Sequence, residues 1–179
     1  MDLQNPAVMP TLDALHREEQ LVNAINYLIA PDLYEAGYKT LEYLQTVPGD
    51  ISKFCEKWPS VSSGMAIIIN RKTKEHTDKH GMYSCYNFLV TAGEYDECTL
   101  DVESLDIKMA YDPGCMTAIC GKIFGHKVPN WNGRLRVCIG HFFRWNVFYR
   151  AKTQILGYVQ EKAYIQIMGN KYATQTQPL

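Results

Sequence analysis

The feature that most constrains the fold is a long series of short apolar runs between residues 64 and 145. Turn-forming residues interrupt the series, as in the sequence DPG at 112–114. The runs are GMAIIIN (64–70), YSCYNFLVT (83–91), TLDVESLDIKMAY (99–111), CMTAIC (115–120), KIFGHKV (122–128) and RLRVCIGHFF (134–143). Many short strands separated by Gly and Pro are typical of an all-β sandwich or barrel. We therefore expect a β core over residues 61–145.

Helical patterns lie on both sides of this core. Residues 11–47 place apolar side chains near helical spacing, and Pro31 divides the pattern into two helices. A short helix is expected in DISKFCEKW (50–58), and VFYRAKTQILGYVQEKAYIQIM (147–168) is again helical in period. The predicted organisation is one α+β domain over residues 1–179, with a helical flank (1–60), the β core (61–145), a C-terminal helix (146–170) and a tail (171–179).

The composition favours a soluble intracellular protein with a sizeable core. Of the 179 residues, 46% are hydrophobic, but no apolar run reaches the roughly 20 residues that cross a bilayer. The N-terminus is acidic and polar, unlike a secretory signal. None of the six cysteines forms a Cys-x-x-Cys pair, so we expect buried free thiols, no structural zinc and no membrane association.

The charge distribution allows two interpretations. The net charge is −1, which argues against a large surface that follows nucleic-acid phosphates. Residues 122–152, however, contain seven Lys and Arg residues and neither Asp nor Glu. This segment is either an ordinary cluster of charges or a cationic face beside a binding site.

A His-x-Asp motif, His76 and Asp78, lies within KEHTDKHG (74–81). On a strand, residues i and i+2 point to the same side, so both side chains can reach one metal ion. Alone, the motif is more often a solvated pair in a surface turn. Two histidines and one carboxylate form the facial triad of non-haem Fe(II) oxygenases, which leaves three positions open. The third ligand must then be another histidine, and the candidates are His16, His80, His126 and His141.

An arginine follows His126 by ten residues, in the run RLRVCIGHFF. A planar, always charged guanidinium suits the bidentate binding of a carboxylate. Strand alternation places Arg136 on the same face as Cys138 and Gly140. An inward arginine followed by small residues suits a cosubstrate carboxylate at the base of a pocket. The alternative is an ordinary surface arginine.

These residues together resemble a known family. His76, Asp78, a histidine 48 residues after Asp78 and Arg136 resemble the Fe(II)/2-oxoglutarate dioxygenases with a double-stranded β-helix. The stretch YDPGCMTAICGKIFGHKVPNWNGRLRVCIGHFFR resembles more narrowly the ten-eleven-translocation and J-binding-protein (TET/JBP) group, in its compact fungal and protist form. That group oxidises methyl groups on DNA bases. The resemblance covers about residues 64–145 and leaves the N-terminal helices without a matching motif.

The resemblance implies roles for seven residues around the cofactors. His76, Asp78 and His126 would bind Fe(II), and Arg136 would hold the distal carboxylate of 2-oxoglutarate, with O₂ as the third reactant. Arg71 matches an arginine near the cosubstrate or the base in relatives. His80 matches a residue beside the pocket, with a turn hydrogen bond as its alternative role. Gly81 stands where relatives carry Asn or Asp against the flipped base.

Further residues belong to the expected shell around the substrate base. Arg144 stands about where relatives carry a histidine near the methylated cytosine, and His141 is the nearest alternative. A flipped base also needs an aromatic partner. Strand neighbours face opposite ways, so one of Phe142 and Phe143 is expected to face the site, with Phe143 as the candidate.

The implied activity is oxidation of 5-methylcytosine in duplex DNA to 5-hydroxymethylcytosine and further products, by base flipping. The alternatives are N6-methyladenine demethylation by the same fold, because Gly81 would open the pocket, and oxidation of RNA or a free nucleobase. A binding module without activity is disfavoured, since all four central residues are present. A nuclear location is expected from the DNA substrate alone.

Overall fold

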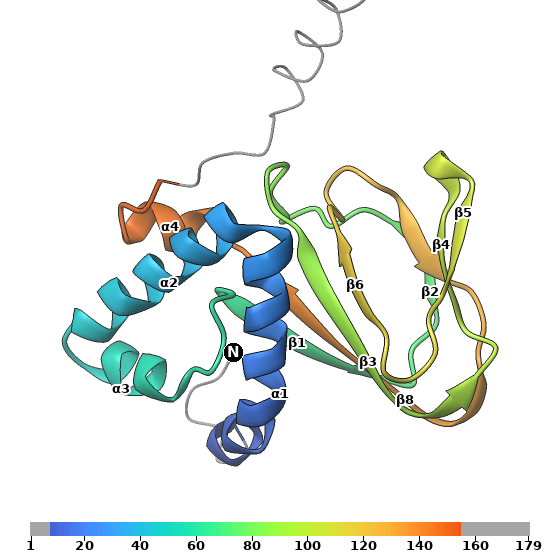
Figure 1. Ribbon diagram of the computed structural model, residues 1–179, viewed down its shortest axis with the longest axis horizontal. Coiled ribbons are helices and arrows are strands. Elements are labelled where there is room, and N and C mark those ends of the chain that lie inside the picture. The colour runs from blue at the N-terminus through green and yellow to red at the C-terminus, as the bar shows by residue number, and fades with distance from the viewer. Residues whose placement is uncertain (1–7, 155–179) are drawn as a thin grey trace, which may run out of the picture.

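The computed structural model describes residues 8–154. Its helices gather on one side and its strands on the other (Figure 1). The N-terminal helices are α1 (Val8–Ile29), α2 (Pro31–Thr46) and α3 (Asp50–Lys57), and a short helix, α4 (Trp145–Arg150), follows the last strand. Pro31 begins α2, where its missing N–H leaves no hydrogen bond unmade. The predicted division of the N-terminal helices at Pro31 is therefore confirmed.

The strands form two antiparallel four-stranded sheets. The eight strands are β1 (Gly64–Ile69), β2 (Thr73–His76), β3 (Asn87–Asp96), β4 (Thr99–Val102), β5 (Ile107–Ala110), β6 (Met116–Ile119), β7 (His126–Val128) and β8 (Asn132–Phe142), with a 3₁₀ turn, η1 (Glu103–Leu105), between β4 and β5. The first sheet has the order β1-β8-β3-β6, and the second has the order β2-β7-β4-β5. Strands adjacent in a sheet are mostly distant in sequence, and the two sheets face each other as a double-stranded β-helix (Figure 1). The predicted α+β class and core fold are confirmed.

Each face of the first sheet packs against a different layer. Along β3, Phe88 belongs to the core shared with the helices, and Leu89 belongs to the core between the sheets. The same alternation along β8 sends Phe143 toward the helices and Cys138 toward the second sheet. Strand side chains alternate between faces, so one strand serves both cores. Burial of each large apolar side chain contributes about 1.5–3 kcal/mol.

A buried polar contact joins α1 to the first sheet. His141 on β8 shares a hydrogen bond of 2.7 Å with the carboxylate of Glu19 on α1, and both side chains are buried. Its other ring nitrogen, Nδ1, lies 3.0 Å from the backbone oxygen of Phe88. This contact fixes the N-terminal helix on the outer face of the β core.

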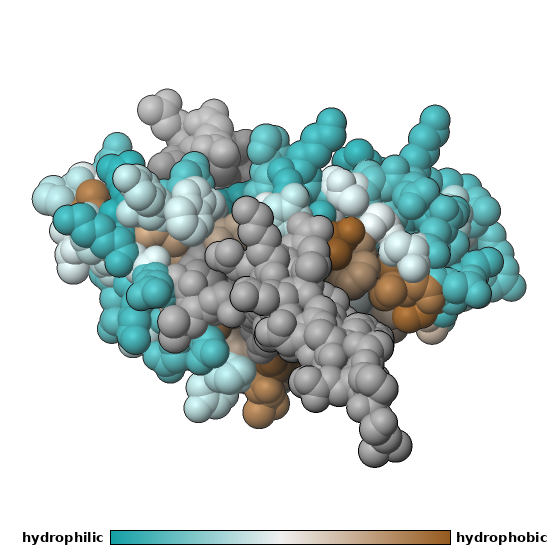
Figure 2. Space-filling model, turned by 90° about the horizontal axis from the view of Figure 1, so that it is seen from above, coloured by the Kyte–Doolittle hydropathy of each residue, from teal (hydrophilic) through white to brown (hydrophobic). Residues whose placement is uncertain are grey.

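Further features of the described residues bear on the expectations from sequence. All six cysteines are free, and all but Cys115 are buried. No helix within residues 8–154 is long and apolar enough to cross a membrane. Among the residues coloured in Figure 2, hydrophilic ones predominate and hydrophobic ones appear in small groups. The predicted C-terminal helix (146–170) differs from the structure in the described part, because α4 ends at Arg150 and residues 151–154 form a turn and coil. The rest of that prediction, from residue 155 onward, and the tail (171–179) lie outside the described residues.

Candidate metal centre and its cavity

Three side chains with metal-binding atoms meet at one end of the second sheet. Ligand atoms of His76, Asp78 and His126 all lie within 4.8 Å of one another. His76 ends β2 and pairs directly with His126, which begins β7, so that their ring centroids are 4.4 Å apart. His126 is buried, Asp78 is half-buried and His76 is exposed. The arrangement has a closed side toward the core and an open side toward solvent.

Hydrogen bonds select the tautomer of both histidines. Nδ1 of His76 lies 2.9 Å from the carbonyl oxygen of Lys74, and Nδ1 of His126 lies 3.0 Å from that of Phe124. A carbonyl oxygen only accepts hydrogen bonds, so each Nδ1 carries the proton and each Nε2 keeps its lone pair. Metal-binding histidines are oriented in this way, with the second nitrogen donating to a carbonyl or carboxylate. Both Nε2 atoms are therefore prepared to bind a cation.

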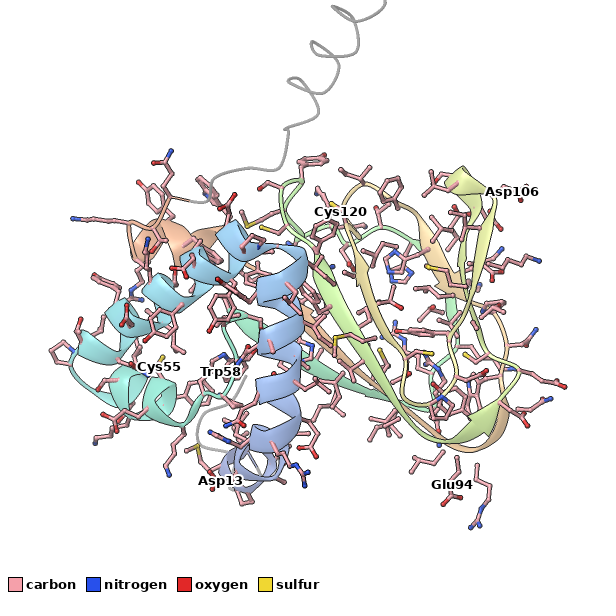
Figure 3. The ribbon with its side chains drawn as sticks, in the orientation of Figure 1. Asp13, Cys55, Trp58, Glu94, Asp106 and Cys120 are labelled. Carbon is pink, nitrogen blue, oxygen red and sulfur yellow. The ribbon has the colours of Figure 1, made fainter. Side chains whose placement is uncertain are left out.

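The argument from i, i+2 alternation requires Asp78 to lie on the same strand as His76, and the structure shows that it does not. β2 ends at His76, and Asp78 lies in the following loop. Its position is set instead by its backbone N–H, which donates to the carbonyl of Gly121 at 2.7 Å. Gly121 follows Cys120, labelled in Figure 3 at the end of β6, so the two loops are joined at this point.

Two residues that sequence reasoning missed hold the Asp78 carboxylate. The side-chain amide of Asn87, which is buried, donates to Oδ2 of Asp78. A Cβ atom at Gly121 would collide with the same oxygen. The carboxylate therefore has one oxygen held by the protein. No sequence pattern indicates these contacts, because they join a loop to positions 9 and 43 residues away.

Arg136 is buried with a charge that lacks a counter-ion. Its side chain is 2% exposed, which excludes the surface alternative. Nη1 donates to the carbonyl of Arg71 at 3.2 Å, while Nε has no hydrogen-bond partner. The guanidinium lies over the rings of Tyr95 and Tyr111, at 5.8 and 5.3 Å from their centroids. Among the described residues, no Asp or Glu forms an ion pair with it.

The groups around Arg136 stay neutral. Burial raises the pKa of Tyr111 above its ordinary value, and burial also raises the pKa of the Cys138 and Cys98 thiols. A phenol and two thiols with raised pKa values carry no negative charge at neutral pH. A buried guanidinium without a counter-ion is strongly unfavourable. The site is therefore suited to an anion supplied by a ligand, and a carboxylate matches the guanidinium geometry.

One cavity joins the candidate metal ligands to Arg136. It has a volume of about 80 Å³ and lies between the two sheets. His76, Asp78, His126 and Arg136 all line it, together with Tyr111, Cys138, Phe142 and apolar side chains of both sheets. Two neutral imidazoles and a carboxylate fit a ferrous ion. The unpaired Arg136 fits the far carboxylate of a dicarboxylate that reaches the same ion.

The structure does not bring two of the predicted substrate residues to this cavity. His141 and Phe143 point to the helical side of β8, where both are buried. Phe142, one position away on the strand, lines the cavity instead. One of Phe142 and Phe143 is expected to face the site, and the residue that does so is Phe142, not the predicted Phe143. The reason is that Phe142 lies on the same face of the strand as Arg136.

The remaining predicted residues lie around the cavity rather than in it. Arg71 is exposed, and it meets Arg136 through its backbone carbonyl. His80 is exposed. Arg144 places its guanidinium 5.0 Å from the ring centroid of Phe142. A Cβ at Gly81 would lie 3.1 Å from the backbone oxygen of Asp78, which is a tight contact within this loop.

Three comparisons relate the chain to known proteins. NgTET1, solved in complex with 5mC DNA, matches with 18% identity and a TM-score of 0.48, over 85% of this chain and 58% of that chain. The chain thus spans less than two thirds of the length of that structure. No curated protein matches the chain. The family model Tet_JBP, the oxygenase domain of the 2OGFeDO superfamily, matches residues 2–149. The chain therefore belongs to the Tet_JBP family of 2-oxoglutarate- and Fe(II)-dependent oxygenases.

Proposed function

We propose that this protein oxidises the methyl group of a methylated base in DNA, with 5-methylcytosine as the substrate and 5-hydroxymethylcytosine as the first product. Membership of the Tet_JBP oxygenase family supports the reaction class. The observation that carries the proposal is the single cavity lined by His76, Asp78, His126 and the unpaired Arg136.

In this proposal three side chains hold the ferrous ion and one holds the cosubstrate. Nε2 of His76, Nε2 of His126 and a carboxylate oxygen of Asp78 would hold the ion, and Arg136 would bind the distal carboxylate of 2-oxoglutarate. When bound, Fe(II) and 2-oxoglutarate would supply oxidation by O₂: one oxygen atom enters the hydroxymethyl product, and the other enters succinate as 2-oxoglutarate loses CO₂. The apolar walls of the cavity exclude water from this step.

The substrate base must leave the duplex to reach the cavity. A methyl group stacked in DNA is out of reach of a centre set between two sheets, and flipping a base costs a few kcal/mol. The ring of Phe142 lines the cavity and is covered by the Arg144 guanidinium. We assign to this pair the contact with the flipped base, in place of His141 and Phe143.

A basic loop beside the opening is suited to the DNA backbone. Nζ of Lys122 donates to the carbonyl of Lys79 at 2.7 Å and lies 5.3 Å from the ring centroid of Tyr83. Lys79 directly follows Asp78, so the ammonium group of Lys122 lies beside the loop that carries this candidate ligand. Lysines in such a position bind phosphates without selecting a sequence.

The test is mass spectrometry of nucleosides after incubation with Fe(II) and 2-oxoglutarate. Duplexes with 5-methylcytosine, duplexes with N6-methyladenine and methylated RNA are compared, with His76→Ala as the inactive control. Formation of 5-hydroxymethylcytosine is expected. If only methyladenine or only RNA is turned over, then that molecule and not 5-methylcytosine is the substrate. If none of them is turned over, the proposal of an active enzyme is contradicted in favour of a binding module.

The nuclear location remains part of this proposal. It depends only on genomic DNA as the substrate. A fluorescent fusion of the full protein in its own cells tests it, and exclusion from the nucleus would contradict it.

A further inference from the structure

A second, larger cavity lies on the helical side of the first sheet. Its volume is about 510 Å³, and α2, α3, α4 and the segment between α3 and β1 line it. Figure 3 shows two of its lining residues, Cys55 and Trp58, beside the helices and away from the second sheet. Cavities of about 300–1,000 Å³ are typical of small-molecule sites. No candidate ligand of the metal centre lines it.

Close packing forms the floor of this cavity. Cys55, Trp58 and Val61 line it and are buried. The indole N–H of Trp58 donates to the carbonyl of Ser62 at 2.7 Å, which holds the ring in place. A Cβ at Gly37 would collide with the Val61 carbonyl, so α2 lies directly against this segment. The floor is therefore apolar, and it is already formed by contacts within the protein itself.

Two polar groups of the cavity have no hydrogen-bond or ion-pair partner within the described residues. Thr40 is 3% exposed, and its hydroxyl makes no hydrogen bond. Arg150 also lines the cavity, and it forms no ion pair with an Asp or Glu of residues 8–154. Guanidinium groups bind carboxylates and phosphates with paired hydrogen bonds. The cavity thus combines an apolar floor with a cationic edge.

We propose that this cavity binds a small amphiphile with an anionic head group. Its apolar body contacts Trp58 and Val61, and its head group binds Arg150. The hydroxyl of Thr40 supplies a further hydrogen bond. The site is separate from the metal centre and does not depend on the proposed oxidation of DNA.

Calorimetry on the full chain tests the head group and the body separately. Decanoate, decyl phosphate and decanol are titrated below their micelle concentrations. Both anions are expected to bind about tenfold or more tightly than decanol, because a charged hydrogen bond is worth about 1.5 kcal/mol or more. The tighter of the two anions identifies the head group. Equal binding of decanol and the anions, or no binding at all, would overturn the proposal.

Two variants locate the ligand in the cavity. Arg150→Ala is expected to remove the preference for anions, whereas Arg17→Ala, on the exposed face of α1, is expected to keep it. Thr40→Val keeps the side-chain shape, and it is expected to weaken binding several-fold while raising the Tm of the free protein. An equal effect of the two arginine variants would overturn the assignment.

Discussion

At the scale of single residues, the chemistry of the site depends on which atoms the protein leaves without partners. The Nδ1 atoms of His76 and His126 are used by backbone carbonyls, and one oxygen of Asp78 is used by Asn87. The guanidinium of Arg136 has one backbone partner and no carboxylate. The free atoms are two imidazole nitrogens, a carboxylate oxygen and a cation, which together suit a metal ion with a dicarboxylate.

Removing the hydrogen bond to the carboxylate should weaken metal binding. We expect Asn87→Ala to lower the affinity for Mn(II), measured by calorimetry, by about 10–100-fold, since partners of metal ligands have effects of this size. Asn132→Ala is the matched control, because Asn132 is exposed and bonds Glu97 instead. Equal affinities of the two variants would show that Asn87 does not orient Asp78.

Replacing the buried arginine should weaken binding of 2-oxoglutarate without lowering the thermal stability of the protein. Arg136→Met is expected to raise the 2-oxoglutarate concentration needed for half-maximal turnover by about 10–100-fold, because one charged hydrogen bond contributes roughly 1.5–3 kcal/mol. The Tm of the variant should not fall, since an apolar residue replaces a buried charge without a counter-ion. Titration of 2-oxoglutarate and thermal melts measure both effects. An unchanged requirement would move the role to Arg134 or Arg71.

At the scale of elements, strand β8 serves two functions through its two faces. Arg136, Cys138 and Phe142 line the cavity, while His141 and Phe143 pack under the helices. A shift of one residue in the register would exchange these sets. Gly121, in the loop between β6 and β7, allows this loop to approach Asp78 closely.

The contact between α1 and β8 should be structural. Glu19→Ala leaves Nε2 of His141 buried without its hydrogen-bond partner, and an unsatisfied buried polar group costs about 1–3 kcal/mol. We expect this loss in the free energy of unfolding, measured with urea, and an unchanged affinity of the folded protein for Mn(II). Glu18→Ala, an exposed neighbour on the same helix, is the control. A changed Mn(II) affinity in Glu19→Ala would show that His141 contributes to the metal site.

The loops beside the metal centre should contact phosphate. Lys122→Ala is expected to weaken binding of methylated DNA and to lower the slope of log K against log salt by about one. Fluorescence anisotropy at several salt concentrations measures this slope. Lys53→Ala on α3 should leave it unchanged, since Lys53 is exposed on the helical side and pairs with Asp50. If Lys122→Ala and the unchanged protein give the same slope, Lys122 does not contact DNA phosphate.

At the scale of the whole molecule, the metal centre joins parts of the chain that are far apart in sequence. β2, the loop after it and β7 each supply one ligand, and all three must be folded for the ligand atoms to meet. A ligand that binds only the native state stabilises it by about 2.7 kcal/mol at a concentration of 100 times Kd.

Metal removal should therefore lower thermal stability. We expect the Tm to fall when EDTA replaces excess Mn(II), by roughly 2–4 °C for each kcal/mol lost in a domain of this size. Differential scanning calorimetry measures the shift. The His76→Ala variant should melt at the same temperature in both conditions, and a shift there would mean that the ion acts at another place.

Residue types and their spacing at positions 76, 78, 126 and 136 indicate a 2-oxoglutarate- and Fe(II)-dependent oxygenase, and the family match confirms that class. Local periodicity separates the helical flank from the β core. These features are local, or they depend on spacing along the chain. The folded chain was needed to show that Phe142 rather than Phe143 faces the cavity, that His141 contacts α1, and that Asn87 and the Gly121 backbone contact Asp78. The physical reason is that strand phase and loop contacts depend on pairing between distant segments, which is set by the packing of both cores.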